Sequence, residues 1–322
     1  MTTVARRRAL HRDRSPWNNG RVTHPEELPQ DHPLDPAFVA RIVAIALDED
    51  LGPAPGRDVT TQATIAASTL VGGAFVARAD GVVAGLATVT ETLRQVADRL
   101  GLEAPSVTQV AADGDRVGPG AELVRVEGLG HVVLIAERTA LNLVSRASGV
   151  ATHTRRWVDA LDGTGARVLD TRKTTPGLRE LEKYAVRCGG GVNKRMGLFD
   201  CAMVKDNHIV AAGSVAGAIE AIAARFPDVP IQVEVESWED ARAALAAGAR
   251  FLMLDNLPPA QMAQLVTRIR DLEPTLGRVW IEATGGLTLA TAREVANTGV
   301  DFMSVGGLTH SSPILDVALD LR

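Results

Sequence analysis

Residues 231–256, IQVEVESWEDARAALAAGARFLMLDN, decide the fold of this chain. Two short apolar runs, IQVEV at residues 231–235 and FLML at residues 251–254, flank the helix-like segment WEDARAALAAGA. A short apolar run followed by a helix and a second apolar run is typical of two parallel strands joined by a crossover helix. This stretch therefore predicts an α/β architecture.

The same pattern recurs through the second half of the chain. Further apolar runs are RVLD from residue 167, AMVK from 202, VWIEA from 279 and DFMSV from 301. Segments with helical spacing separate the later runs. Six such strands suit a barrel of the TIM type or a close variant, and an open doubly wound sheet is the alternative.

The first half has a different texture. Residues 35–52 have an Asp-Pro start, helical apolar spacing and a Gly stop. Residues 66–128 alternate apolar and polar positions around Gly turns, with a helix-like stretch at 86–102, which predicts a mixed α+β unit. The basic, Pro-dotted start predicts a disordered tail. We expect a tail (1–34), an α+β domain (35–138), an α/β barrel (139–308) and a C-terminal segment returning to the first domain (309–322).

Composition excludes several classes of protein. The 322 residues carry a formal net charge of −5, a sequence pI near 5.8 and 3% aromatics, which argues against a nucleic-acid partner. No apolar run approaches the roughly 20 residues of a membrane helix, and the basic, polar start is not expected to be a secretory signal. With only Cys188 and Cys201, one disulfide is possible, but a reduced cytoplasmic chain is favoured.

Polar residues follow the apolar runs at the point where each predicted strand ends. Because active sites of parallel α/β barrels lie at the carboxyl ends of the strands, we expect these side chains to share one edge. Six such ends are hard to explain by solvation alone. The residues are Arg172, Lys173, Lys205, Glu234, Asp255, Thr284, Gly285, Gly306 and Gly307.

The last two strand ends, ATGG and SVGG, predict a phosphate site, because small residues let backbone N–H groups approach an anion and late barrel loops often bind phosphate. Ordinary turns also use Gly pairs. Glu234 and Asp255 are carboxylates that could hold Mg²⁺ or accept sugar hydroxyls, and salt bridges to nearby cations are the alternative.

Cations gather between residues 172 and 205. We expect Arg172, Lys173 and Lys205, with Lys194 and Arg195 after a Gly-rich turn, to converge on one anion. A helix is predicted to begin at Thr175-Pro176, and its cations Arg179, Lys183 and Arg187 are expected to form a solvated face. No nucleophile elbow or paired-cysteine zinc spacing occurs. These features favour transfer chemistry on a phosphorylated sugar.

Several long motifs carry a resemblance to a known family. They are ERTALNLVSRASGVAT (137–152), LDTRKTTPGLRELEKYAVRCGGGVNKR (169–195), MVKDNHI, VEVES, LMLDN, IEATGGL and SVGGLTHS. In order and content they resemble quinolinate phosphoribosyltransferases. The resemblance implies an N-terminal α+β open sandwich, an incomplete seven-stranded α/β barrel of TIM-like form, and a homodimer or higher oligomer with shared active sites.

The resemblance also implies an activity in NAD biosynthesis. The family transfers phosphoribose from phosphoribosyl pyrophosphate to quinolinate with decarboxylation, using Mg²⁺. Lys173, Glu234 and Asp255 would be catalytic, with Glu234 and Asp255 also holding the ribose hydroxyls and the metal. Further substrate contacts would be Arg138 (donated across the dimer), Arg172, Lys194, Arg195, Lys205, Thr284, Gly285, Gly306, Gly307 and His310.

Lys194 departs from the family pattern, which has histidine between Asn193 and Arg195. Lysine is longer, permanently charged and strongly hydrated. It could still bind a carboxylate, or the protein could be a paralogue for another pyridine carboxylate. A catalytically silent homologue that binds a metabolite is the third alternative.

Overall fold

The computed structural model describes residues 33–322, so the expected tail falls outside the described residues except for Pro33 and Leu34. Within them the chain forms two compact units. The barrel unit consists of Trp157–Arg172 and Val192–Gly306. The sandwich unit consists of the chain from residue 33 to Arg156, Lys173–Gly191 and Gly307–Arg322.

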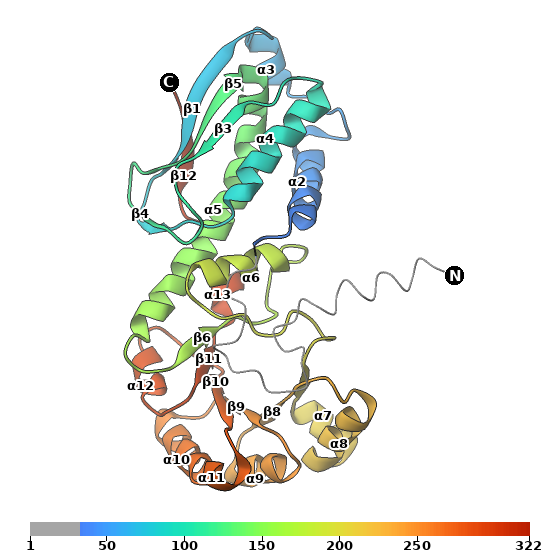
Figure 1. The fold of residues 1–322 in the computed structure, drawn as a ribbon, viewed down its shortest axis with the longest axis vertical. Coiled ribbons are helices and arrows are strands. Elements are labelled where there is room, and N and C mark those ends of the chain that lie inside the picture. The colour runs from blue at the N-terminus through green and yellow to red at the C-terminus, as the bar shows by residue number, and fades with distance from the viewer. Residues whose placement is uncertain (1–32) are drawn as a thin grey trace, which may run out of the picture. The chain divides into compact units, whose positions relative to one another are not determined.

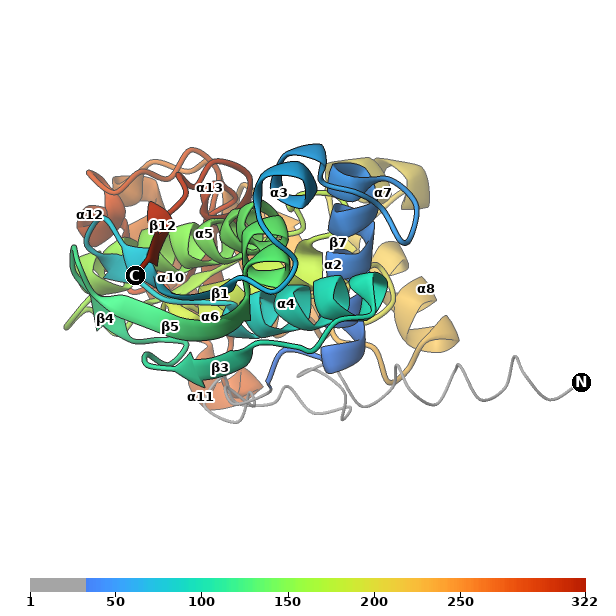
Figure 2. The ribbon, with the colours of Figure 1, turned by 90° about the horizontal axis from the view of Figure 1, so that it is seen from above.

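The sandwich unit contains a four-stranded antiparallel sheet in the order β12-β1-β5-β3 and a two-stranded β2-β4 sheet. The helices α2 and α4 of this unit pack against each other (Figures 1 and 2). Its strands are β1 (Leu70–Ala77), β2 (Gly81–Val82), β3 (Ser106–Gln109), β4 (Arg116–Val117), β5 (Glu122–Leu129) and β12 (Val317–Leu321). Its helices are α2 (Pro36–Leu51), α3 (Val59–Thr64), α4 (Leu86–Leu100), α6 (Arg179–Cys188), α13 (Gly307–His310) and most of α5 (Gly130–Ala160).

Helix α2 shows how local sequence fixes an element. The Asp35 side chain accepts a hydrogen bond from the Ala37 N–H at 3.1 Å, and Pro36 is the first helical residue. Gly52 ends the helix with φ 79°, a conformation that other residues rarely adopt. The predicted helix at residues 35–52 is therefore confirmed.

The barrel unit is built on six parallel strands in the order β6-β11-β10-β9-β8-β7, with helices around them (Figure 1). The strands are β6 (Arg167–Leu169), β7 (Ala202–Val204), β8 (Ile231–Val235), β9 (Phe251–Asp255), β10 (Trp280–Thr284) and β11 (Phe302–Ser304). All six predicted strands are confirmed. The helices are α7 (Asp206–Ala212), α8 (Val215–Arg225), α9 (Trp238–Ala246), α10 (Pro259–Arg270), α11 (Glu273–Leu276) and α12 (Ala292–Ala296).

A seventh position in the wall is a single residue. Val192 forms an isolated parallel bridge with Leu169 on β6, beyond the end of the six-stranded sheet. The closing loop, which we define as residues 193–201, then leads from this bridge to β7 at the opposite edge of the sheet. The barrel is therefore completed by a bridge and a loop instead of a full strand.

Large apolar side chains fill the interior of the barrel. The rings of Phe251 and Phe302 are stacked with centroids 5.9 Å apart, and the Trp280 ring lies 5.8 Å from that of Phe302. Burying rings of this size contributes much of the stability of a core. The buried cluster consists of Leu169, Val192, Phe251, Met253, Trp280 and Phe302.

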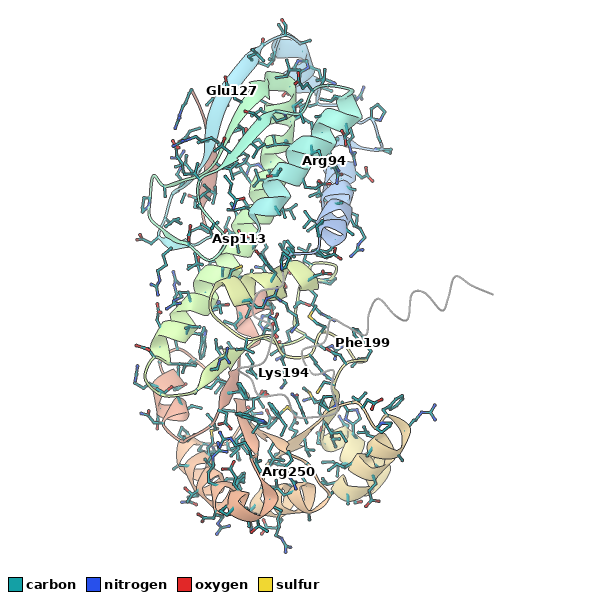
Figure 3. The ribbon with its side chains drawn as sticks, viewed as in Figure 1. Arg94, Asp113, Glu127, Lys194, Phe199 and Arg250 are labelled. Atoms are coloured by element: carbon teal, nitrogen blue, oxygen red, sulfur yellow. The ribbon has the colours of Figure 1, made fainter. Side chains whose placement is uncertain are left out.

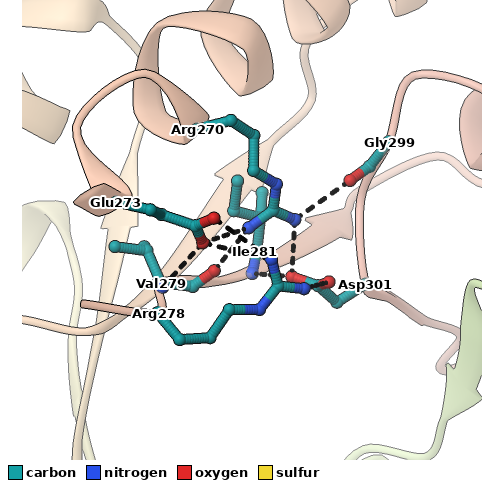
Figure 4. A network of polar contacts seen from close by, with 7 residues as sticks. All are labelled: Arg270, Glu273, Arg278, Val279, Ile281, Gly299 and Asp301. Atoms are coloured by element: carbon teal, nitrogen blue, oxygen red, sulfur yellow. Dashed lines mark hydrogen bonds and ion pairs between the residues drawn. The ribbon is translucent and has the colours of Figure 1, made fainter.

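A charged network ties together the starts of β10 and β11 (Figure 4). Arg270 donates to Glu273 at 2.8 Å and to Asp301 at 2.9 Å, and Arg278 pairs with the same two carboxylates. Glu273 also accepts from the Val279 N–H at 2.9 Å. Burial alone would raise the pKa of Glu273, but these hydrogen bonds and the two guanidinium charges outweigh it and hold the pKa below 4.5.

Helix α6 differs from its prediction in two respects. It begins at Arg179, after a turn at Pro176 and Gly177, and not at Thr175-Pro176. The expected solvated face is wrong, because Lys183 is only 1% exposed. The neighbouring Glu182 is fully buried and accepts from Arg146 and from the Thr175 hydroxyl, so this part of the helix faces the interior of the sandwich unit.

The division into units also differs from the expected domain ranges. Helix α5 is one continuous segment of 31 residues, and its residues up to Arg156 belong to the sandwich unit. Residues 173–191 belong to that unit as well, although they fall within the expected barrel range. No change in local sequence marks a boundary inside a continuous helix.

In the described residues no single helix is long and apolar enough to cross a membrane, and only the bent pair α7 and α8 together meets that criterion.

Candidate active site

The polar ends of the barrel strands lie along one edge of the sheet. Asp255 is the last residue of β9 and is the register partner of Thr284, the last residue of β10. Glu234 is paired with Met253 on the neighbouring strand β9. Lys205 directly follows β7. The structure therefore brings together the strand-end residues that belong to the barrel unit.

Lys205 and Glu234 form an ion pair at this edge. The Lys205 Nζ atom lies 2.5 Å from Oε2 of Glu234, and the Glu234 side chain is only 9% exposed. A salt bridge was the alternative to a ligand role for Glu234, and the structure contains that salt bridge. Asp255 is half-buried and accepts a hydrogen bond from the Asn256 side chain at 2.8 Å.

The turn after β10 packs tightly against the turn after β9. Asn256 has a left-handed backbone with φ 52°, and its N–H donates to the Thr284 carbonyl at 2.9 Å. Gly285 has φ 87°, and a Cβ atom there would lie 2.2 Å from Oδ1 of Asn256. Only glycine therefore fits at residue 285, because Asn256 occupies the space beside it.

Two guanidinium groups lie close to each other near the same strand ends. Arg172 follows β6, and Arg195 lies in the closing loop, where its Nη1 donates to the Cys201 carbonyl at 3.0 Å. Burial, and then the positive charge of Arg172, lower the pKa of Arg195. The Nε of Arg172 is buried with no hydrogen-bond partner within residues 33–322. Two like charges in a partly buried site favour the binding of an anion.

Lys194 lies inside the barrel, and Figure 3 labels it together with Phe199 of the same loop. Its Nζ donates to Oε1 of Glu282 at 2.6 Å and to Sδ of Met253 at 3.1 Å. Lys194 is 5% exposed and Glu282 is fully buried. The ammonium group is therefore engaged by a carboxylate of the barrel interior.

Sequence reasoning missed Glu282. It lies two residues before Thr284 on β10, so the alternation of a strand directs both side chains to the same face. A charged residue on the interior face of a buried strand needs a partner, and that rule could have identified it.

Four of the expected site residues belong to the sandwich unit. Arg138 lies on α5 and is exposed. Lys173 is exposed, and its carbonyl accepts from the Thr309 hydroxyl at 2.7 Å. His310 is exposed and contacts the Ser311 hydroxyl through Nδ1 at 2.6 Å, and Gly307 begins α13.

The donor groups of the barrel unit suit a magnesium ion better than a softer metal. Within the described part of the chain, no three His, Cys, Asp or Glu side chains cluster as a metal site. Mg²⁺ is commonly held by one or two carboxylates together with substrate phosphates and water, which matches Glu234 and Asp255. Both cysteines are free, and burial raises the pKa of the Cys188 and Cys201 thiols to about 12, so neither is a thiolate nucleophile.

Comparison with known proteins gives a consistent result over nearly the whole chain. Residues 58–148 match the family model "Quinolinate phosphoribosyl transferase, N-terminal domain", and residues 150–320 match that of its C-terminal domain. A nicotinate-nucleotide pyrophosphorylase (carboxylating) from Mycobacterium leprae is 48% identical over 277 residues, which cover 86% of this chain and 94% of the relative. A chloroplastic one from Arabidopsis thaliana is 38% identical over 303 residues, with coverages of 90% and 84%.

A solved structure agrees with these sequence matches. The nicotinate-nucleotide pyrophosphorylase from Francisella tularensis superposes with a TM-score of 0.81 at 32% identity and covers 90% of this chain and 98% of its own. This agreement confirms the predicted fold class, an α+β unit with an α/β barrel. The chain belongs to the quinolinate phosphoribosyltransferase family.

Proposed function

We propose that the protein transfers phosphoribose from phosphoribosyl pyrophosphate to quinolinate and releases CO₂, giving nicotinate mononucleotide and pyrophosphate for NAD biosynthesis. The observation that carries this proposal is the partly buried pair of like charges, Arg172 and Arg195, on the edge that also bears Glu234, Asp255 and the Gly285 turn. One side of this edge suits a small dianion, and the other suits a sugar phosphate.

Quinolinate has two adjacent carboxylates on a pyridine ring. Planar guanidinium groups bind carboxylates through two parallel hydrogen bonds, so Arg172 and Arg195 can orient both groups. An anion that binds between them would relieve their mutual repulsion further than the nearby Asp200 carboxylate does. We therefore assign the dicarboxylate to these two residues.

The ribose would lie at the acids. Charge develops on the anomeric carbon as the ring nitrogen attacks and pyrophosphate leaves, and Glu234 and Asp255 can stabilise that positive charge. The Gly285 turn, where only glycine fits beside Asn256, can bring backbone N–H groups to the 5′-phosphate.

The leaving group would need positive charge. Lys173, the residue after Arg172, is assigned to the pyrophosphate, with Lys205 able to exchange its Glu234 contact for substrate. Mg²⁺, when bound at Glu234 and Asp255, would neutralise part of the negative charge of the departing pyrophosphate. After ring attack, the C2–carboxylate bond breaks, CO₂ leaves, and the quaternised ring stabilises the electron pair left on C2. That carbon then takes up one proton from water to give nicotinate mononucleotide.

Part of the site would come from a second copy of the chain. Arg138 is an exposed cation of α5, and the proposal assigns it to the active site of the partner in a homodimer. The proposal also includes a cytoplasmic location, which the two free cysteines support.

A second candidate is a paralogue for a different pyridine carboxylate. It is favoured by one observation, the engagement of Lys194 by Glu282, which leaves the pocket one cation fewer for the substrate. A pyridine monocarboxylate would need fewer cations than quinolinate.

Turnover tests the proposal directly. The purified protein, with quinolinate, phosphoribosyl pyrophosphate and Mg²⁺, is expected to release CO₂ and pyrophosphate in equal amounts. Product from a pyridine monocarboxylate, but none from quinolinate, would favour the paralogue. An absence of product from every pyridine acid would point to a silent homologue. The matched control is Arg172→Met, which is expected to abolish turnover while the protein remains folded.

A further inference from the structure

The buried pair of Lys194 and Glu282 crosses the interior of the barrel. Glu282 is on β10, in the middle of the sheet, whereas Lys194 is in the closing loop that connects the two edges of the sheet. The ammonium nitrogen and the carboxylate oxygen are 2.6 Å apart. The second oxygen of Glu282 is buried without a partner within residues 33–322, so Lys194 is the charge that compensates Glu282.

The backbone beside Lys194 is fixed independently. The Lys194 N–H donates to Oδ1 of Asp170 at 2.8 Å, and the side-chain Nδ2 of Asn193 donates to Oδ2 of the same carboxylate at 2.6 Å. Asp170 is fully buried. The start of the closing loop is therefore held at Asp170 by the Lys194 N–H and the Asn193 side chain, and at Glu282 by the Lys194 side chain.

Arg195, the next residue, needs such a support. It is half-buried beside the like charge of Arg172, and repulsion between the two guanidinium groups would displace a mobile loop. Its own hydrogen bond to the Cys201 carbonyl, at 3.0 Å, stays within the loop and does not tie it to the sheet. The tie to the sheet comes from the two residues before it.

The charges at this edge divide into two kinds. Lys194 is paired with Glu282, and Lys205 is paired with Glu234. Arg172 and Arg195 form no ion pair with any acid of residues 33–322. Of these four cations, the two arginines are therefore the ones without an ion pair in the described part of the chain, although the charge of Asp200 in the closing loop acts on Arg195.

We propose that Glu282 is a positioning residue for the reaction: by holding Lys194 inside the barrel, it fixes the closing loop so that Arg195 faces the pyridine dicarboxylate, and Lys194 itself does not contact the substrate. This inference rests on the proposed function. It assigns a positioning role to Glu282. It also assigns Lys194 to the residues that support the closing loop and not to those that bind the substrate.

A double-mutant cycle on the KM for quinolinate tests this proposal. Glu282→Gln and Lys194→Met each leave the other charge buried without compensation, and each is expected to raise the KM for quinolinate at least about tenfold, as contacting charged groups usually couple that strongly. The Lys194→Met/Glu282→Gln double variant lacks the same tie as each single variant, so its KM for quinolinate is expected to be raised no further than that of the more affected single variant. The KM for phosphoribosyl pyrophosphate should change by less than about twofold in all three.

A direct role of Lys194 in substrate binding gives a different pattern. Lys194→Met would raise the KM for quinolinate, Glu282→Gln would leave it unchanged or lower it, and the double variant would keep the full defect of Lys194→Met. That result overturns the proposal. Glu273→Gln, which breaks the network at the other ends of the strands, is the control and should lower the Tm without changing either KM.

The wild-type enzyme separates the two proposals. Wild-type protein that releases no CO₂ from quinolinate contradicts the proposed function and overturns this inference with it. If the wild type is active and the effects of the two single variants on the KM for quinolinate add up in the double variant, this inference alone is overturned.

Discussion

The side chain of Asn256 occupies the space into which any side chain at residue 285 would point. A Cβ atom on Gly285 would lie 2.2 Å from Oδ1 and 2.5 Å from Cγ of Asn256, and Gly285 has φ 87°. The two turns at the ends of β9 and β10 are thus fitted to each other.

The first prediction follows from this fit. Gly285→Ala is expected to raise the KM for phosphoribosyl pyrophosphate at least about tenfold, because either Asn256 or the turn must move. Gly101→Ala is the matched control, since Gly101 has a left-handed backbone with φ 64° but no atom within 4 Å of its Cβ position. Both variants carry the backbone strain, about 1 kcal/mol, so an equal KM change in both would mean that the Asn256 contact is irrelevant. Steady-state kinetics and thermal unfolding measure the two effects.

The second prediction concerns the two arginines. Arg195→Met removes one of two like charges, so the Tm is expected to stay the same or to rise while kcat/KM for quinolinate falls at least about tenfold. The physical reason is that repulsion between Arg172 and Arg195 destabilises the protein without substrate, whereas the carboxylates of the substrate offset it. A Tm that falls together with activity would show that Arg195 stabilises the fold instead. Arg225→Met, at the end of α8, is a control for the loss of an arginine.

The third prediction concerns the shared site. Arg138→Ala and Arg172→Ala are each expected to be inactive as homodimers. Purified mixed dimers of the two should regain about half of the wild-type sites, because one of the two sites then contains both arginines. Tagged subunits and a two-step purification provide mixed dimers of known composition. Proven mixed dimers without activity would contradict the assignment of Arg138 to the partner's site.

The fourth prediction is a dependence of stability on pH. The folded-state pKa of Glu273 lies below its ordinary value of 4.5, so its stabilising contribution is present above about pH 4.5 and is lost as the pH falls through the folded-state pKa. Glu273→Gln is expected to lower the free energy of unfolding by about 1–2 kcal/mol at pH 7. The difference from wild type should shrink as the pH falls below about 4.5.

Denaturant unfolding at several pH values measures this difference. Glu220→Gln, in the exposed part of α8, is the control and should change the free energy of unfolding by less than about 0.5 kcal/mol. A difference for Glu273→Gln that stays constant between pH 7 and pH 3 would contradict the linkage.

Local sequence sufficed for most elements and for the candidate residues. The strand-helix repeat predicted all six strands of the barrel unit, because buried parallel strands are short apolar runs. Asp35, Pro36 and Gly52 marked the ends of α2 for reasons that act within a few residues. The position of polar residues after each run placed Lys205, Glu234 and Asp255 on one edge, since parallel strands end on the same side.

Pairing partners were decided only by the tertiary structure. Lys183 was expected in solvent and is buried, and Lys194 was expected at the substrate but is paired with Glu282, which is 88 residues away in sequence. The local sequence does not show whether a charged side chain faces water, a ligand or a buried carboxylate. The choice depends on the distance to the opposite charge and on the exclusion of water, and both are set by how strands far apart in the chain pack together.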